Sequence, residues 1–130
     1  YNNTIALADS PDVVRKKIMS MVTDPARIHK TDPGHPEVCS VFSYHKLFSE
    51  DQLAEIEHAC RNGEIGCVAC KRKLADNIAG LLTPIYEKRQ EWLRRTDDIK
   101  DIIIEGNKKA RMKAEETMAE VRRVMKIDWI

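Results

Sequence analysis

The chain has 130 residues, of which 42% are hydrophobic, 33% charged and only 5% aromatic, and its net charge is +1 at pH 7. That length amounts to one domain, and a net charge near zero excludes a protein drawn to nucleic acid by its overall charge. No stretch reads as a signal peptide, a transmembrane segment or a low-complexity tract, so we expect a cytoplasmic protein with no membrane partner, in which disulfides are disfavoured.

The first predicted helix follows a lead-in formed by residues 1–10. Ser10 is a typical N-cap residue, and proline is well tolerated at the next position, the first of the helix. An apolar stripe then recurs at helical spacing, at Val14, Ile18 and Met21. Residues 23–25 end the helix, because the residue before a proline avoids the helical region. Residues 27–37 read as a loop, in which His35 is a weak candidate metal ligand.

Two short helices are predicted before the middle of the chain. The first spans residues 38–47, with Val38, Phe42 and His45 facing inward. The second opens with a capping box, in which Ser49 is the N-cap and Gln52 the third helical residue. It ends near residue 62, where the following glycine favours a left-handed turn.

Two long helices make up the rest of the chain, over residues 67–95 and 96–126. Pro84 lies inside the first and predicts a kink. Residues 96–98 are predicted to cap the second helix. A connection of a few residues requires the two helices to be antiparallel. The predicted fold is therefore all-α, a helical bundle with two long antiparallel C-terminal helices and a four-cysteine site that joins them to the shorter N-terminal helices.

All four cysteines of the chain fall within one window and read C-x20-C-x6-C-x2-C, at Cys39, Cys60, Cys67 and Cys70. Four thiolates brought together suit a metal ion or an iron–sulfur cluster. Buried core cysteines and a redox CxxC pair are the less favoured readings, since a CxxC redox motif usually follows a βαβ pattern that is missing here. Structural zinc sites commonly use two close pairs, and only one is present, so the spacing favours a cluster and leaves zinc open.

Three segments carry a family resemblance. Residues 1–5 (Tyr-Asn-Asn-Thr-Ile) and the helix after them resemble the stretch that follows the KMSKS loop of bacterial tryptophanyl-tRNA synthetases. Residues 82–87 are similar to that family's L-x-P-I-x-E segment, and residues 105–110 to its E-G-x-x-K-A segment. The resemblance covers essentially the whole chain. It implies that residues 1–130 form the helical C-terminal, anticodon-binding domain, with residues 1–10 leading in from a catalytic domain.

A subset of these synthetases carries a 4Fe–4S cluster on the pattern C-x22-C-x6-C-x2-C. This chain resembles that subset around the cysteines as well, in residues 36–39 and 65–71. It is two residues shorter in the first interval, at the predicted turn near Ser49, and a loop can absorb such a change. The resemblance implies that the four cysteines bind a 4Fe–4S cluster.

The implied enzyme is a class I ligase that attaches tryptophan to its tRNA with ATP. The sequence contains no HIGH or KMSKS motif and begins at Tyr1, so we expect a fragment that is inactive alone, with no catalytic residues and no ATP site of its own. The implied partners are tRNA(Trp) and the missing catalytic domain, and the full-length enzyme is expected to be a homodimer. Two basic clusters are candidate tRNA contacts: Lys71, Arg72 and Lys73, then Lys108, Lys109 and Arg111.

Two other functions stay open from the residues. One is a zinc-stapled helical interaction module, in which the basic clusters are ordinary solvated helix faces. The other is a redox-sensing cluster domain, in which loss of the cluster disorders residues 39–70 and switches binding.

Overall fold

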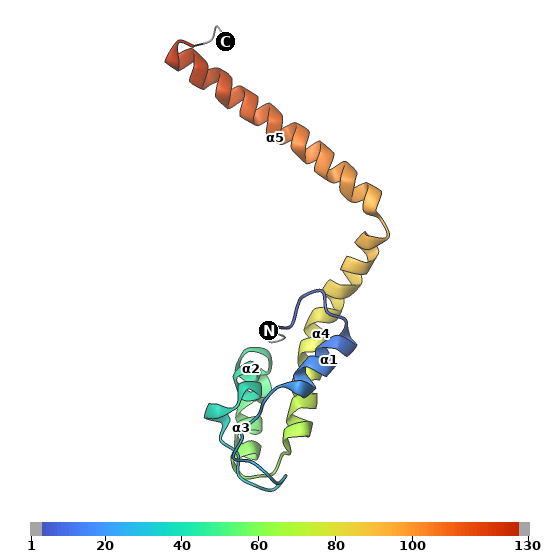
Figure 1. The fold of residues 1–130 in the computed structure, drawn as a ribbon, viewed down its shortest axis with the longest axis vertical. Coiled ribbons are helices and arrows are strands. Elements are labelled where there is room, and N and C mark those ends of the chain that lie inside the picture. The colour runs from blue at the N-terminus through green and yellow to red at the C-terminus, as the bar shows by residue number, and fades with distance from the viewer. Residues whose placement is uncertain (1–3, 128–130) are drawn as a thin grey trace. The chain divides into compact units, whose positions relative to one another are not determined.

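The computed structural model describes residues 4–127, so Tyr1 to Asn3 of the resemblance above lie outside the described residues. Every regular element in residues 4–127 is a helix, which confirms the all-α prediction (Figure 1). The elements are α1 (Pro11–Ser20), η1 (Pro36–Val38), α2 (Ser40–Phe48), η2 (Glu50–Gln52), α3 (Leu53–Arg61), α4 (Cys67–Leu93) and α5 (Thr96–Met125). None of the described helices is long and apolar enough to cross a membrane.

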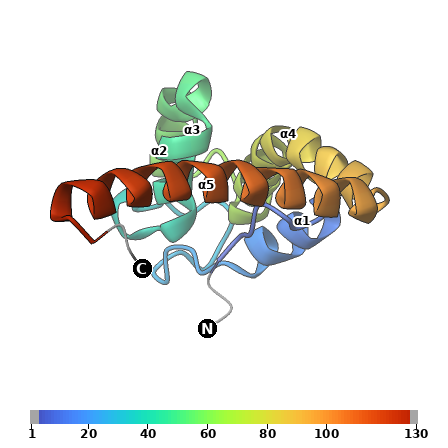
Figure 2. The same ribbon diagram turned by 90° about the horizontal axis from the view of Figure 1, so that it is seen from above.

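The chain divides into two compact units, Tyr1–Arg89 and Gln90–Ile130. In the first unit, α1 lies beside the first half of α4, and α2 lies beside α3 (Figures 1 and 2). These four helices share one hydrophobic core, whose largest members are Val14, Ile18, Val41, Phe42, Ile56, Leu74, Ile78 and Leu82. Burying such a side chain contributes about 1.5–3 kcal/mol, so this core is what fixes the helix ends that carry the cysteines.

The start of α1 follows its prediction. The Ser10 hydroxyl accepts a hydrogen bond from the Val13 amide at 3.4 Å, and Val14 and Ile18 are fully buried. An ion pair between the side chains of Arg15 and Asp76 then ties α1 to α4. The predicted apolar period and cap were therefore sufficient to locate this helix.

Two predictions in the middle of the first unit are wrong. Val38 is 61% exposed, because it belongs to η1, and α2 begins only at Ser40. The capping box is also absent: residues after Ser49 form the short 3-10 helix η2, with no side-chain cap. The Ser49 hydroxyl is not available for capping because it lies 2.8 Å from His45 Nδ1 and 2.8 Å from Asn77 Nδ2. Tertiary partners thus outcompete the local capping pattern.

The second unit contains the last predicted helix, which the structure forms as α5. α5 begins after Arg95, whose Nε donates a hydrogen bond to Asp98 Oδ2 at 2.6 Å. Residues 96–98 were predicted to cap this helix, but no side chain in residues 4–127 caps its N-terminus. The helix ends where Lys126 adopts a left-handed φ of 57°. None of its residues is buried. The other long helix, α4, continues through Pro84 to Leu93. The antiparallel packing of α4 and α5 stays a prediction.

A buried carboxylate organises the loop between α1 and α2. Asp24 accepts hydrogen bonds from the Ala26 amide at 2.9 Å and from both the amide and Nδ1 of His35, at 2.9 and 2.8 Å. The hydrogen bond from the His35 ring and then that from the Ala26 amide lower the pKa of Asp24 below its ordinary value of 3.8. The predicted candidate ligand His35 is therefore engaged with a carboxylate.

Because the folded pKa of Asp24 lies below its unfolded value, the stabilisation is complete above about pH 4 and is lost as the pH falls through the folded pKa. Asp24→Asn is expected to be less stable than wild type at pH 7, and the difference in unfolding free energy is expected to shrink below about pH 4. Urea unfolding of both proteins between pH 3 and pH 7 measures it. A difference that stays constant across that range would contradict the prediction.

Candidate metal centre

The four cysteines lie at the ends of three helices in the first unit. Cys39 immediately precedes α2, Cys60 is in the last turn of α3, and Cys67 and Cys70 occupy the first turn of α4. Cys39 and Cys70 are buried, whereas Cys60 and Cys67 are partly exposed, and all four are free thiols. The two residues of the CxxC pair are three apart in one helix, so they occupy the same side of that helix.

Two glycines allow the surrounding loops to approach the Cys60 end of α3. Gly63 has a φ of 69°, as predicted for the left-handed turn, and a side chain there would overlap the Thr31 carbonyl. The Gly34 amide donates to the Cys60 carbonyl at 2.9 Å, and a Cβ atom on Gly34 would lie 2.6 Å from Cys60 Sγ. The loop therefore packs directly against the Cys60 sulfur, and residue 34 has no room for even a methyl group.

Burial and the neighbouring thiols both affect the pKa values of the cysteines. Burial, followed by the neighbouring thiols Cys39, Cys60 and Cys67, raises the pKa of Cys70 to about 12. Burial also raises the pKa of Cys60, against the lowering effect of Arg27. Four thiolates in this environment require a compensating positive charge, which a bound metal centre supplies. In residues 4–127, no group of three or more His, Cys, Asp or Glu side chains is arranged to hold a metal ion.

Arg27 is the residue at this site that sequence reasoning missed. Its Nη1 lies 3.8 Å from Cys60 Sγ and 3.9 Å from Cys67 Sγ, so one nitrogen is shared by two thiols. Its Nη2 donates to the carbonyls of Lys30 and Ile65, each at 2.6 Å, which fixes the loop against the start of α4. The Arg27 Nε is buried and has no hydrogen-bond partner in the described part of the chain. No local sequence signal marks this loop arginine as a contact of the cysteines.

His45 contacts a third thiol, that of Cys70. Its ring is fully buried, as predicted for the inward face of this helix, and Nε2 lies 3.3 Å from Cys70 Sγ and 3.2 Å from the Cys70 carbonyl oxygen. Burial lowers the pKa of His45, so the ring is neutral at pH 7. The site thus combines the partly exposed cation of Arg27 near Cys60 and Cys67 with the buried neutral ring of His45 near Cys70.

The first predicted basic cluster separates into three environments. Arg72 is exposed and makes no hydrogen bond or ion pair within residues 4–127. Lys71 Nζ donates to the Met19 carbonyl at 2.9 Å, and Lys73 Nζ pairs with Glu55 at 3.1 Å. Only Arg72 is therefore free to contact a partner without giving up an internal bond.

Arg72 lines a groove of about 460 Å³ beside the cysteines. We call it the basic groove; its lining includes Arg27, His29, Lys30, Cys67 and Arg72. The groove lies at the N-terminus of α4, where the helix dipole and free amides favour a negatively charged ligand. This arrangement is suited to an anionic group such as a phosphate of a nucleic acid.

The second predicted basic cluster lies on α5, in the second unit. Lys108 Nζ pairs with Glu105 at 2.6 Å, and Lys108 and Arg111 line a separate shallow hollow with Ile104 and Asn107. Lys109 is exposed on the same helix. These residues belong to the second unit, whereas the four cysteines belong to the first.

Comparison with known proteins identifies the family to which the chain is similar. Residues 1–83 match the family described as tRNA synthetases class I (W and Y). The chain is 45% identical over 129 residues to the tryptophan–tRNA ligase of Aquifex aeolicus, covering 98% of this chain and 33% of that protein. It is 41% identical to the tryptophan–tRNA ligase of Thermotoga maritima, covering 98% of this chain and 39% of the relative.

A solved structure is similar as well. The crystal structure of tryptophanyl-tRNA synthetase from Campylobacter jejuni matches with a TM-score of 0.81 and 30% sequence identity, covering 96% of this chain and 40% of that chain. The chain spans about a third to two fifths of the length of the relatives it matches.

Proposed function

Because the chain belongs to the class I tRNA synthetases (W and Y), we propose that it is the helical anticodon-recognition domain of a tryptophan–tRNA ligase. Relatives that carry this name match 98% of the chain. The whole enzyme would attach tryptophan to tRNA(Trp) with ATP, in the cytoplasm and as a homodimer. In it, a catalytic domain would perform the chemistry and this domain would bind the tRNA.

The observation that carries the RNA-binding role is the basic groove. Arg72, Arg27 and Lys30 all line this groove, which lies at the positive end of α4. Anticodon loops present backbone phosphates and unstacked bases, which proteins bind with arginine side chains and with free backbone amides. A groove of this size and charge fits a phosphate or one unstacked base.

The cysteine site is proposed to hold a 4Fe–4S cluster through Cys39, Cys60, Cys67 and Cys70. The donor set is composed of thiols, which is the ligand set of such clusters. A four-iron cluster takes each thiolate at a separate corner, so it does not require the four sulfurs to converge on one point as a zinc ion does.

In this proposal the cluster is a brace and takes no part in the ligase reaction. It would fasten the first turn of α4 to the ends of α2 and α3, and thereby hold the basic groove in shape. Arg27 would serve both features, since it contacts two of the thiols and also lines the groove. Metal and sulfide analysis of protein made without oxygen tests the cluster, and one bound zinc with no sulfide would contradict it.

Arg72→Ala is expected to weaken tRNA(Trp) binding and to reduce the slope of log K against log salt by about 0.7, the loss of one contact to single-stranded phosphate. Lys73→Ala is the matched control, because that lysine is paired with Glu55 and is a neighbour on the same helix. Binding of the full-length protein to tRNA(Trp) at several salt concentrations measures both. Equal effects of the two substitutions, or an unchanged slope in Arg72→Ala, would show that the basic groove does not contact the RNA.

A further inference from the structure

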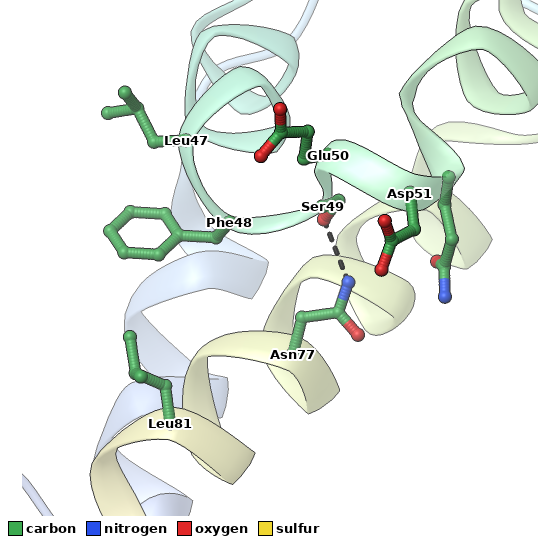
Figure 3. Close-up of a pocket in the computed structure, with 8 residues that line it drawn as sticks. Leu47, Phe48, Ser49, Glu50, Asp51, Asn77 and Leu81 are labelled. Carbon is green, nitrogen blue, oxygen red and sulfur yellow. Dashed lines mark hydrogen bonds between the residues drawn. The ribbon is translucent and has the colours of Figure 1, made fainter.

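A chain of buried polar groups connects Cys70 to the surface of the first unit. It runs from Asn77 on α4 to Ser49 at the end of α2, to His45 on α2, and back to Cys70 on α4. Ser49 and His45 are 4% and 0% exposed, whereas Asn77 lies in the wall of a surface pocket between α4 and the end of α2. Figure 3 shows the Asn77 amide directed at the Ser49 hydroxyl.

Geometry fixes the direction of these hydrogen bonds. His45 Nε2 faces the Cys70 carbonyl oxygen at 3.2 Å, which only accepts, so the proton of the neutral ring must be on Nε2. His45 Nδ1 then accepts, and the Ser49 hydroxyl donates to it at 2.8 Å. The Ser49 oxygen in turn accepts from the Asn77 amide at 2.8 Å. Each donor therefore points toward Cys70.

The same Nε2–H lies 3.3 Å from Cys70 Sγ, within reach of an N–H···S hydrogen bond shared with the carbonyl. Cys70 thus has a hydrogen-bond donor in the buried His45 ring, which is itself held by the hydrogen bonds of Ser49 and Asn77. Cys60 and Cys67 instead share the partly exposed Arg27. The two sides of the site differ in the donors offered to sulfur.

We propose that His45 is a positioning residue for Cys70, which orients this sulfur and donates a hydrogen bond to its thiolate when the site is loaded. The inference rests on the four-thiolate site proposed above. A hydrogen bond to a cluster thiolate stabilises the more negative, reduced form, so it raises the reduction potential. It also lowers the charge on Cys70, and the fixed ring keeps this ligand in place.

His45→Leu removes the donor at similar size, and His45→Gln retains one N–H toward Cys70 and an acceptor toward Ser49. The full-length protein is loaded without oxygen, and the midpoint potential and the rate of iron release to a chelator are measured. We expect a downward shift of potential and at least a several-fold faster release in His45→Leu, with most of both effects reversed in His45→Gln. Ser49→Ala, which frees the ring proton to move to Nδ1, is expected to shift both in the same direction by less.

Val14→Ala is the control for lost core packing, because Val14 is also fully buried but lies on α1. It is expected to lower the melting temperature without moving the potential. If His45→Leu binds a cluster with the same midpoint potential and iron-release rate as Val14→Ala, the positioning role of His45 is overturned. The proposed cluster site is then unaffected. If His45→Leu does not fold, Ser49→Ala decides by the same two measurements. A wild-type protein that takes up no cluster overturns the proposed site together with this inference.

Discussion

Cys70→Ser is expected to abolish cluster binding and to lower the melting temperature by about 10 °C or more. Cys70 is buried in the first turn of α4, so its loss removes one of the two proposed ligands that belong to the core. A ligand present at only 100 times its dissociation constant stabilises the folded state by about 2.7 kcal/mol, and each kcal/mol shifts the melting temperature by roughly 4 °C in a domain of this size. Iron and sulfide analysis with thermal melting, before and after loading, measures both effects.

Ala69→Ser is the control for this substitution. It places a hydroxyl on the adjacent, exposed position of the same helical turn, where no thiol is lost. It is expected to retain the iron and sulfide of the wild type and to melt within about 2 °C of it, since the helix propensities of serine and alanine differ by about 0.5 kcal/mol. A Cys70→Ser protein with full iron and sulfide would show that Cys70 is not a ligand.

Gly34→Ala is expected to have the second largest effect, through Cys60. Its new Cβ would lie 2.6 Å from Cys60 Sγ and 3.2 Å from the Cys60 carbonyl oxygen that the Gly34 amide now binds. Either the sulfur leaves its position or the loop moves away and loses that hydrogen bond. We expect impaired cluster loading and a loss of about 1–3 kcal/mol of unfolding free energy, as for overpacked sites.

Gly80→Ala provides the matched control, because a Cβ at that position on α4 has no atom within 4 Å. The same chemical change is expected there to stabilise the protein by about 0.5–1 kcal/mol and to leave cluster loading unchanged. Chemical unfolding and the iron content of the two variants measure the comparison. Normal loading of Gly34→Ala would mean that the Cys60 sulfur is not confined as the structure shows.

Local patterns predicted the parts of the fold that local energetics control. Ser10 with the apolar stripe after it located α1, and Gly63 marked the left-handed turn before α4. The wrong prediction of a capping box lies where a distant residue decides. The Ser49 hydroxyl has the sequence context of a cap but is bound by His45 and Asn77.

The candidate site was predictable to the same extent. The spacing of the cysteines identified the thiols, and the family resemblance, now confirmed by relatives that match nearly the whole chain, named the enzyme class. Arg27 could not be found in this way, because a single loop arginine has no local signature and its thiol contacts span 33 and 40 residues. Nor could the sequence separate Arg72 from Lys71 and Lys73, since their partners lie on other helices.

In the proposed cluster site, the spacing between Cys39 and Cys60 would also affect the unfolded chain. Bonds from both sulfurs to one cluster would close α2 and α3 into a ring, and closing a ring of this length costs the unfolded chain about 3 kcal/mol of configurational entropy at 25 °C. That restriction acts for as long as the metal–sulfur bonds survive unfolding. Loss of the metal would lift this restriction, so that proteases are expected to cut the metal-free protein between α2 and α3 more readily than the loaded protein.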